Sequence, residues 1–291
     1  MKPKDIALAV LVAFAWGFNF VAIRWGLDAF PPLFFSALRF MCAAFPAIFL
    51  VGRGNVPWKY ILEVGLFLGF LMFALLFVGM QIGMPPGLSS LVIQSQTVFT
   101  SIMAAIFLKD RPTLIQGLGI GVAIGGIVLV GFNAGGQTSL TGLILVLLAA
   151  NCWAVSNIIM KVAGNVDMFR LIIWMTPLPI LPLLVLSGIF ESNQIAALIN
   201  IDWSEVFAIG FTGLVCTTWA LSVWGRLLKT YPTNVVVPFA LLVPIFGILS
   251  AIVVFGESFG VLKIVASAVV FLGVATNVLG QGFVNRRNHR I

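Results

Sequence analysis

The sequence predicts an all-α integral membrane protein, and three observations support this fold class. Ten apolar stretches of membrane-spanning length follow one another along the 291 residues. Hydrophobic residues make up 61% of the chain and charged residues 9%, against roughly 45–50% and 25% in soluble domains. The stretches also lack the period-2 alternation of a transmembrane barrel. Because a hydrocarbon core of about 30 Å requires about 20 apolar residues with satisfied backbone groups, each stretch is predicted to be a helix.

Ten transmembrane helices are expected, and proline marks the start of several. Pro31-Pro32, Pro57, Pro85-Pro86, Pro112 and Pro232 stand at expected helix starts, where a missing N–H costs little. Only the join near residues 190–204 is long enough for an extra element, so no soluble domain is expected. The expected spans are residues 6–26, 31–51, 60–80, 86–107, 113–132, 141–161, 168–189, 205–225, 233–255 and 260–281.

The positions of Lys and Arg predict that both termini are cytoplasmic, an N-in/C-in topology. With the N-terminus inside, thirteen of the 16 basic residues fall on the cytoplasmic side. Arg24 and Lys263 remain outside, and Arg39 lies within the second span. This basic face would meet anionic membrane lipid, which accounts for the formal charge of +7 without a nucleic-acid partner. We therefore expect a multi-pass protein of the inner (cytoplasmic) membrane.

An internal repeat is indicated by two sets of matched residues. Each predicted repeat holds five spans, in residues 1–135 and residues 136–291. Because five is odd, the second repeat is inverted in the membrane, as in transporters that work by alternating access, although channels can share this architecture. The matched pairs are Trp16 with Trp153, Asn19 with Ser156 and Arg24 with Lys161, shifted by 137 residues, and Pro85 with Pro232 and Asp110 with Glu257, shifted by 147.

Nearly the whole chain resembles the EamA group of the drug/metabolite transporter superfamily. Residues 83–112 (GMPPGLSSLVIQSQTVFTSIMAAIFLKDRP) and 238–258 are similar to its fourth and ninth helices, and residues 15–27 and 31–49 to its first two. Among its members, exporters of amino acids and cysteine-pathway metabolites are the most similar. The resemblance implies two five-helix EamA-like repeats and export of small metabolites. The usual Glu after the fourth helix is Asp110 here, and the usual Gly before it is Lys109.

Polar and aromatic residues within the spans are few, and those that share a helix face are expected to line a substrate cavity. For the polar residues the alternative is helix–helix hydrogen bonding, worth about 0.6–2 kcal/mol. For the phenylalanines it is packing or lipid contact. The expected substrate-binding residues are Trp16, Asn19, Arg39, Phe73, Phe77, Gln94, Thr97, Ser101, Trp153, Ser156, Asn157, Trp219 and Ser222.

Arg39 is the one charged residue expected well inside a span, about 12 Å along its helix. A charge at that depth is costly and normally faces protein or water. Its guanidinium could pair with a substrate carboxylate. The alternative is that it snorkels outward or binds carbonyl groups at helix ends.

Small residues and prolines predict how some spans pack and bend. Gly117, Gly121 and Gly125 form two overlapping G-x-x-x-G motifs, which we expect to pack inside the bundle of a monomer, with a dimer face as the alternative. The thiols of Cys42, Cys152 and Cys216 are expected to be buried and free. Kinks are predicted in the seventh and ninth spans at Pro177, Pro179, Pro182, Pro238 and Pro244.

The acids lie at the ends of spans or in loops, and the sole His, His289, lies in the tail. Because proton relays use carboxylates or imidazoles within the membrane, we expect gradient-driven facilitated diffusion of amino acids or related small metabolites. The alternatives are a broad-specificity drug/metabolite exporter coupled to protons and a lipid flippase. The sequence has no phosphate-binding loop and no activated nucleophile, so we expect that the protein neither hydrolyses ATP nor acts as an enzyme. We also expect no cofactor and no bound metal.

Overall fold

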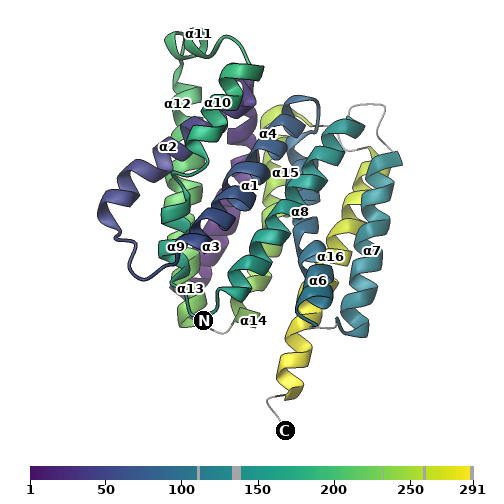
Figure 1. The fold of residues 1–291 in the computed structure, drawn as a ribbon. Helices are drawn as coiled ribbons and strands as arrows, with labels where there is room; N and C mark the ends of the chain where they lie inside the picture. The colour runs from purple at the N-terminus through teal and green to yellow at the C-terminus, as the bar shows by residue number, and fades with distance from the viewer. Residues whose placement is uncertain (110–111, 133–138, 232, 258–259, 289–291) are drawn as a thin grey trace.

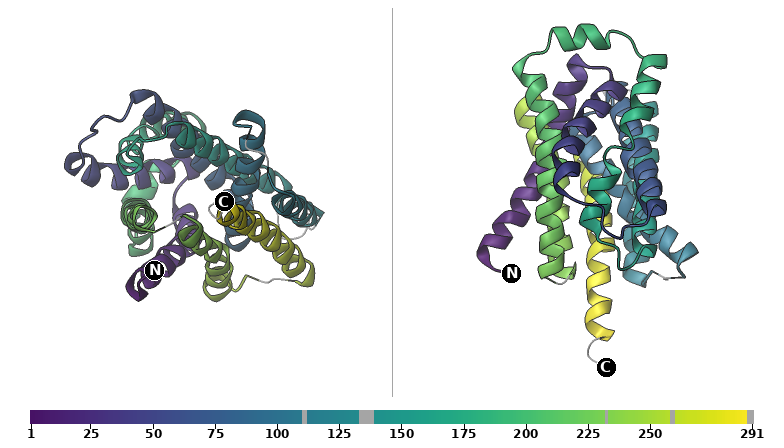
Figure 2. Two further views of the ribbon diagram at one scale, coloured as in Figure 1. Left: turned by 90° about the horizontal axis from the view of Figure 1, so that it is seen from below. Right: turned by 60° about the vertical axis from the view of Figure 1, so that its left-hand side comes forward.

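The structure is a computed structural model that describes residues 1–109, 112–132, 139–231, 233–257 and 260–288. It is a bundle of long helices in which Met1 and the end of the last helix, α16 (Val261–Asn288), lie at the same end (Figures 1 and 2). We call this end the termini face. The short helix α11 (Gln194–Ile199) lies at the opposite end, which we call the α11 face. Asp110, Pro232 and His289 lie outside the described residues.

Five helical rods make up the first half of the chain, and prolines precede several of them as expected. Pro31, Pro57 and Pro85 are the residues directly before α2, α3 and α5. The rods are α1 (Pro3–Ala29), α2 (Pro32–Leu50), α3 (Trp58–Val64) continued by η1 (Gly65–Met72) and α4 (Phe73–Gln81), α5 (Pro86–Val92) continued by η2 (Ile93–Ser95) and α6 (Gln96–Phe107), and α7 (Leu114–Phe132).

The second half also consists of five helical rods, with α11 as an extra element in the long join. The kink predicted in the seventh span is confirmed, because its helix is interrupted between α9 and α10 at Pro177 and Pro179. The rods are α8 (Leu140–Val162), α9 (Met168–Met175) with α10 (Ile180–Phe190), α12 (Trp203–Gly210) continued by η3 (Phe211–Trp219) and α13 (Ala220–Thr230), α14 (Thr233–Val236) continued by η4 (Val237–Leu241) and α15 (Leu242–Phe255), and α16.

Length and composition confirm an all-α membrane protein. Within the described residues, nine helical stretches are long and apolar enough to cross a bilayer, and α16 contains a shorter apolar stretch, Ile264–Val278. Helical segments that depart from α geometry occur in corresponding rods of the two halves. The third and eighth rods contain the π-helices η1 and η3, and the fourth and ninth contain the 3₁₀ segments η2 and η4.

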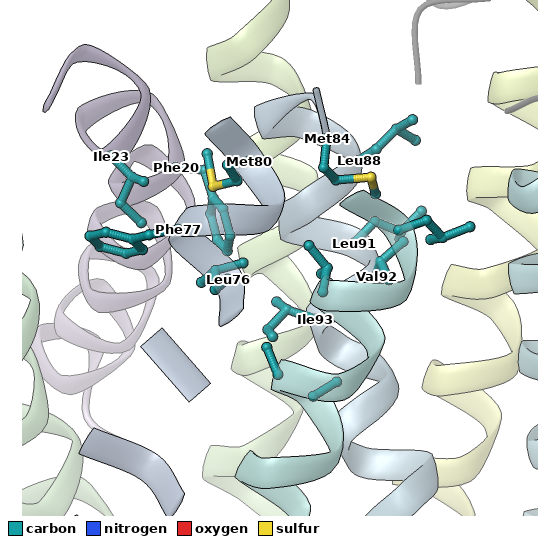
Figure 3. Close-up of a cluster of buried hydrophobic side chains, with 14 of the residues drawn as sticks. Phe20, Ile23, Leu76, Phe77, Met80, Met84, Leu88, Leu91, Val92 and Ile93 are labelled. Carbon is teal, nitrogen blue, oxygen red and sulfur yellow. The ribbon is translucent and has the colours of Figure 1, made fainter. Parts of the chain in front are cut away.

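The largest cluster of buried side chains extends over α1, α2, α4, α5, α7, α8 and α16, and Figure 3 shows its part around α1, α4 and α5. Phe77 of α4 is fully buried, and Ile23 of α1 and Leu88 of α5 are at most 1% exposed. Lipid tails are as apolar as these side chains, so close packing rather than exclusion of water must hold the helices together. Cys42, Cys152 and Cys216 are free thiols, as expected, but of the three only Cys216 is buried, and the other two are half-buried.

Glycines bring α7 and α16 into close contact, but they are not the ones that the motif predicted. A Cβ atom at Gly119 would lie 2.6 Å from the Asn277 nitrogen, and one at Gly126 would lie 2.5 Å from the Val270 nitrogen. By contrast, a Cβ at any of the three motif glycines would meet open space. The expectation that Gly117, Gly121 and Gly125 pack inside the bundle is therefore wrong, because another face of α7 is turned toward α16.

Candidate functional site

Arg39 of α2 is buried inside the bundle rather than reaching outward, with 2% of its surface exposed. Its guanidinium carbon lies 3.9 Å from the ring centre of Phe73 and 5.8 Å from that of Phe77. The face of an aromatic ring attracts a cation, and the attraction is stronger where water is excluded. Two predicted site residues of α4 thus surround the predicted cation of α2.

The polar contacts of Arg39 engage only one of its guanidinium nitrogens. Nη2 donates to the Thr217 hydroxyl at 2.8 Å and to the Thr212 carbonyl at 3.3 Å, both in η3. Nε and Nη1 have no hydrogen-bond partner, and no carboxylate of the described residues pairs with Arg39. Arg39 is therefore a buried positive charge with N–H donors that have no acceptor. Burying such a charge costs free energy unless an anion pairs with it and accepts these hydrogen bonds.

The π-helix η3 creates this binding surface for Arg39. Thr217 donates its hydroxyl to the Thr212 carbonyl at 3.0 Å, and Arg39 reaches the same carbonyl. A Cβ at Gly213 would lie 2.7 Å from the Arg39 carbonyl oxygen, so glycine permits the close approach of α2 to η3. Single π turns inside α-helices are frequent at functional sites.

A second group of predicted residues lies on α1, η3 and α13, which contact one another. Trp16 donates its indole N–H to the Cys216 carbonyl at 3.0 Å, and its ring centre lies 5.2 Å from that of Trp224. Asn19 Oδ1 is buried with no hydrogen-bond partner. Trp219 is half-buried, and Ser222 donates to the Thr218 carbonyl at 2.5 Å. Arg39 and these residues of α1 and α13 therefore pack against the same π-helix, η3.

The polar stripe of η2 and α6 bonds to its own helix and to two helices of the second half. Gln94 donates to the Ala240 carbonyl of η4 at 3.4 Å, and Thr97 donates to the Gln94 carbonyl at 2.9 Å. Ser101 donates to the Asn277 side-chain oxygen in α16 at 3.0 Å. The bonds from Gln94 and Ser101 join the two halves inside the bundle.

Asn157 is the predicted residue of α8 that bonds to α6. Asn157 donates through Nδ2 to Gln96 Oε1 at 2.6 Å and to the Thr100 hydroxyl at 3.1 Å. Trp153 is half-buried against the large apolar cluster, and the buried Ser156 hydroxyl has no hydrogen-bond partner. The described contacts thus gather most of the predicted residues in two groups, one around η3 and one along η2 and α6.

Sequence reasoning missed five polar partners of these residues: Gln96, Thr100, Thr212, Thr217 and Asn277. The i, i+4 spacing of Gln96 and Thr100 was a usable signal for a polar face toward α8. Thr212 and Thr217 are five residues apart, and no α-helical period brings such a pair together. Asn277 is 1% exposed, and the residues four and three positions before it, Gly273 and Val274, are not polar, so no polar stripe leads up to it.

An open cleft of about 520 Å³ lies elsewhere, between the α2–α3 join and the α8–α9 join. Its lining is polar in part and includes Arg170 and Asp167, which form an ion pair at 3.4 Å. No residue of the predicted site lines it. The remaining lining residues are Gly54, Asn55, Val56, Pro57, Ala163, Asn165 and Val166.

Similarity to known proteins extends over the whole chain. The model of the EamA-like transporter family matches residues 4–132 and, a second time, residues 140–279. A protein of Salmonella typhimurium named "Probable amino-acid metabolite efflux pump" is 38% identical over 299 aligned positions, which cover 100% of this chain and 99% of that protein. A protein of Escherichia coli K12 with the same name is 38% identical over 288 positions, which cover 96% of each chain.

A solved structure described only as "Crystal structure of protein" has the same fold, with a TM-score of 0.67 and 17% identity over 99% of each chain. The fold, the doubled family match and the full-length relatives agree. This chain belongs to the EamA-like transporter family.

Proposed function

We propose that this transporter exports amino acids or related small metabolites across the inner membrane, by alternating access driven by the substrate's own gradient. Export is supported by full-length similarity, at 38% identity, to two proteins named as probable amino-acid metabolite efflux pumps. The separate family matches to residues 4–132 and 140–279 support two repeats, within residues 1–135 and 136–291. Rocking of two inverted repeats would open a shared site to one side of the membrane at a time.

The surroundings of Arg39 are the observation that supports a substrate with a carboxylate. It is a buried cation with two unpartnered nitrogens, and the described residues around it supply rings and hydroxyls but no carboxylate. A substrate carboxylate would supply the missing charge through charge-assisted hydrogen bonds, which are about twice as strong as neutral ones. The nearby rings of Phe73 and Phe77 suit the apolar part of an amino acid.

Arg39 is 2% exposed, so a substrate reaches its guanidinium only when a helix packed on it moves, and we assign this movement to η3. The guanidinium lies against Phe73 and is held by Thr212 and Thr217 of η3. A shift of η3 would release Nη2 and admit the carboxylate to the guanidinium. The predicted residues of α1 and α13 pack on the same π-helix, so the same shift would carry Trp219 and Ser222 with it.

The test is uptake of labelled amino acids into proteoliposomes that contain the purified protein, with and without an imposed proton gradient. We expect flux of neutral or aromatic amino acids down their own gradient, unchanged by the proton gradient. Flux that requires the proton gradient would overturn the facilitated-diffusion step and leave export in place.

Two further assays separate the proposal from its alternatives. A fluorescent drug and a lipid with a labelled headgroup are offered to the same vesicles. Transport of the drug without amino acid flux would replace the proposal with a drug exporter, and headgroup movement without amino acid flux would replace it with a flippase.

A further inference from the structure

Two carboxylates of the second half hold backbone N–H groups of the first half at the α11 face. Glu191, directly after α10, accepts from Leu33 at 2.7 Å through Oε1 and from Phe34 at 3.0 Å through Oε2. Glu257, in the turn after α15, accepts from Gly87 at 3.1 Å through Oε2. Each acid is far from its partner in sequence, by 158 or 157 residues for Glu191 and by 170 for Glu257.

The helices that receive these carboxylates cannot cap themselves. The residue before α2 is Pro31 and the one before α5 is Pro85, and neither helix has a side-chain cap from that position. The first N–H groups of a helix have no acceptor within the helix and carry partial positive charge. Near lipid, leaving them without a partner is costly. In this structure the capping groups come from the other half of the chain.

Three helices of the second half, α8, α9 and α12, obtain their caps locally. Ser139 accepts from Gly142 at the start of α8, and Asp167 accepts from Phe169 and Arg170 at the start of α9. Asp202 and Glu205 form a capping box at the start of α12. Capping between the halves is therefore a particular feature of α2 and α5 among these helices, rather than the general way in which this chain ends its helices.

Contacts between the halves at the termini face use other chemistry. Asp5 of α1 pairs with Arg226 at 2.8 Å and accepts from the Tyr231 hydroxyl at 2.7 Å. Arg170 donates to the Gly52 carbonyl at 2.7 Å, and Trp174 donates to the Val51 carbonyl at 2.8 Å. In none of these contacts does a carboxylate accept from a backbone N–H group of the other half, so the two faces of the bundle are held by separable sets of bonds.

We propose that Glu191 and Glu257 are conformational clasps, whose release from α2 and α5 opens the α11 face during each transport cycle. Both acids are half-buried at the edge of the bundle, so water can replace them on the backbone N–H groups when the halves separate. The inference rests on the proposed function in one respect, namely that the halves move relative to each other.

The test measures distances between the halves and does not depend on knowing the substrate. In a background without Cys42, Cys152 and Cys216, spin labels are placed at the exposed positions Ile82 and Val261 for the Glu257 clasp. A second pair of spin labels, at the exposed positions Ala29 and Ser192, measures the distance across the Glu191 clasp. Double electron–electron resonance in lipid nanodiscs then compares the parent with Glu191→Gln, Glu191→Ala, Glu257→Gln and Glu257→Ala.

We expect each substitution to at least double the long-distance population across its own clasp. Alanine should have more effect than glutamine, because glutamine keeps an acceptor oxygen and loses only the charge. Glu205→Gln is the matched control, since Glu205 caps only its own helix through the Asp202 N–H at 2.7 Å. It should leave both distances unchanged. Unchanged distances in all four clasp variants would overturn the proposal.

A second measurement keeps the proposal testable if a variant folds poorly. In the same cysteine-free background with Glu191 and Glu257 intact, a short bis-maleimide that joins Ala29→Cys to Ser192→Cys should stop transport, because the α11 face could no longer open. Undiminished flux after complete cross-linking would also overturn the clasps. Altered distances in a protein that transports no amino acid would instead count against the proposed substrate and leave the clasps standing.

Discussion

Asn157 of α8 and Gln96 of α6 share a hydrogen bond of 2.6 Å, with Nδ2 of the asparagine donating to Oε1 of the glutamine. The two residues come from different halves of the chain, and both are half-buried. The Thr100 hydroxyl accepts a second bond from the same amide. An amide within a bilayer has few other hydrogen-bond partners, so this bond helps to fix the alignment of α6 with α8.

We expect Asn157→Leu to lower the free energy of unfolding by about 0.6–2 kcal/mol, since it leaves the Gln96 side chain without its partner. Unfolding in mixed micelles of increasing denaturing detergent measures the change. A double-mutant cycle with Gln96→Leu isolates the pair, and its coupling energy should be about 0.6 kcal/mol or more. Additive single effects would mean that the two amides do not interact.

Arg39→Met should reduce amino acid flux about tenfold or more, because a charge-assisted hydrogen bond contributes about 1.5–3 kcal/mol and tenfold corresponds to 1.4 kcal/mol. Arg39→Lys should restore part of the flux, since its ammonium keeps the charge but cannot reproduce the planar guanidinium. The measurement is uptake of an amino acid against that of its amide, which lacks the carboxylate.

The matched control is Thr217→Val, which removes an Arg39 partner and leaves the positive charge in place. This variant should keep the preference for the amino acid over its amide. If Arg39→Met keeps that preference as well, the guanidinium does not bind the carboxylate and serves to hold η3 against α2.

Gly126→Leu should destabilise the protein by about 1–3 kcal/mol or more, because a Cβ there would lie 2.5 Å from the Val270 nitrogen in α16. Gly121→Leu on the same helix makes the same chemical change in open space, and its effect should stay within about 0.5 kcal/mol. Thermal unfolding of the two purified variants checks the difference. Equal losses would contradict the close contact of α7 with α16.

The N-in/C-in topology predicts opposite labelling on the two faces of the bundle. In intact cells, a membrane-impermeant maleimide should modify a cysteine placed at Ser192 beside α11. A cysteine at Asn55, in the α2–α3 join, should react only after the cells are permeabilised. Both positions are exposed in the structure, so unequal reaction reports the side of the membrane rather than burial. The reverse pattern would require the opposite orientation of the protein.

Sequence reasoning predicted the helices well because apolar length is a local property. Each of the expected spans corresponds to a helical rod, and the long join contains α11. Orientation of a helix about its own axis is not local, and there the prediction for Gly117, Gly121 and Gly125 failed. In a bilayer an apolar face is equally compatible with lipid and with a neighbouring helix, so hydropathy cannot tell these faces apart.

The candidate site shows the same limit. The depth of Arg39 in its span could be predicted from spacing, but its partners Thr212 and Thr217 belong to a helix far along the chain. Their alignment depends on the π geometry of η3, for which an α-helical period gives no signal. Polar stripes in the sequence predicted many of the residues that form hydrogen bonds between helices. Only the packed structure shows that these residues form two groups, one around η3 and one along η2 and α6.

The π turns of η3 also set which residues of this rod can be lost. A π turn holds one residue more than an α turn, because its hydrogen bonds join residues five apart rather than four. Removing one residue from Phe211–Trp219 would therefore let the chain close as an ordinary α-helix, and α13 beyond it would keep Trp224 beside Trp16 and Arg226 beside Asp5. The loss would fall on the bond between Thr217 and the Thr212 carbonyl, and so on the surface that holds Arg39. The same deletion inside α13 would instead rotate everything beyond it by about 100° and turn Arg226 away from Asp5.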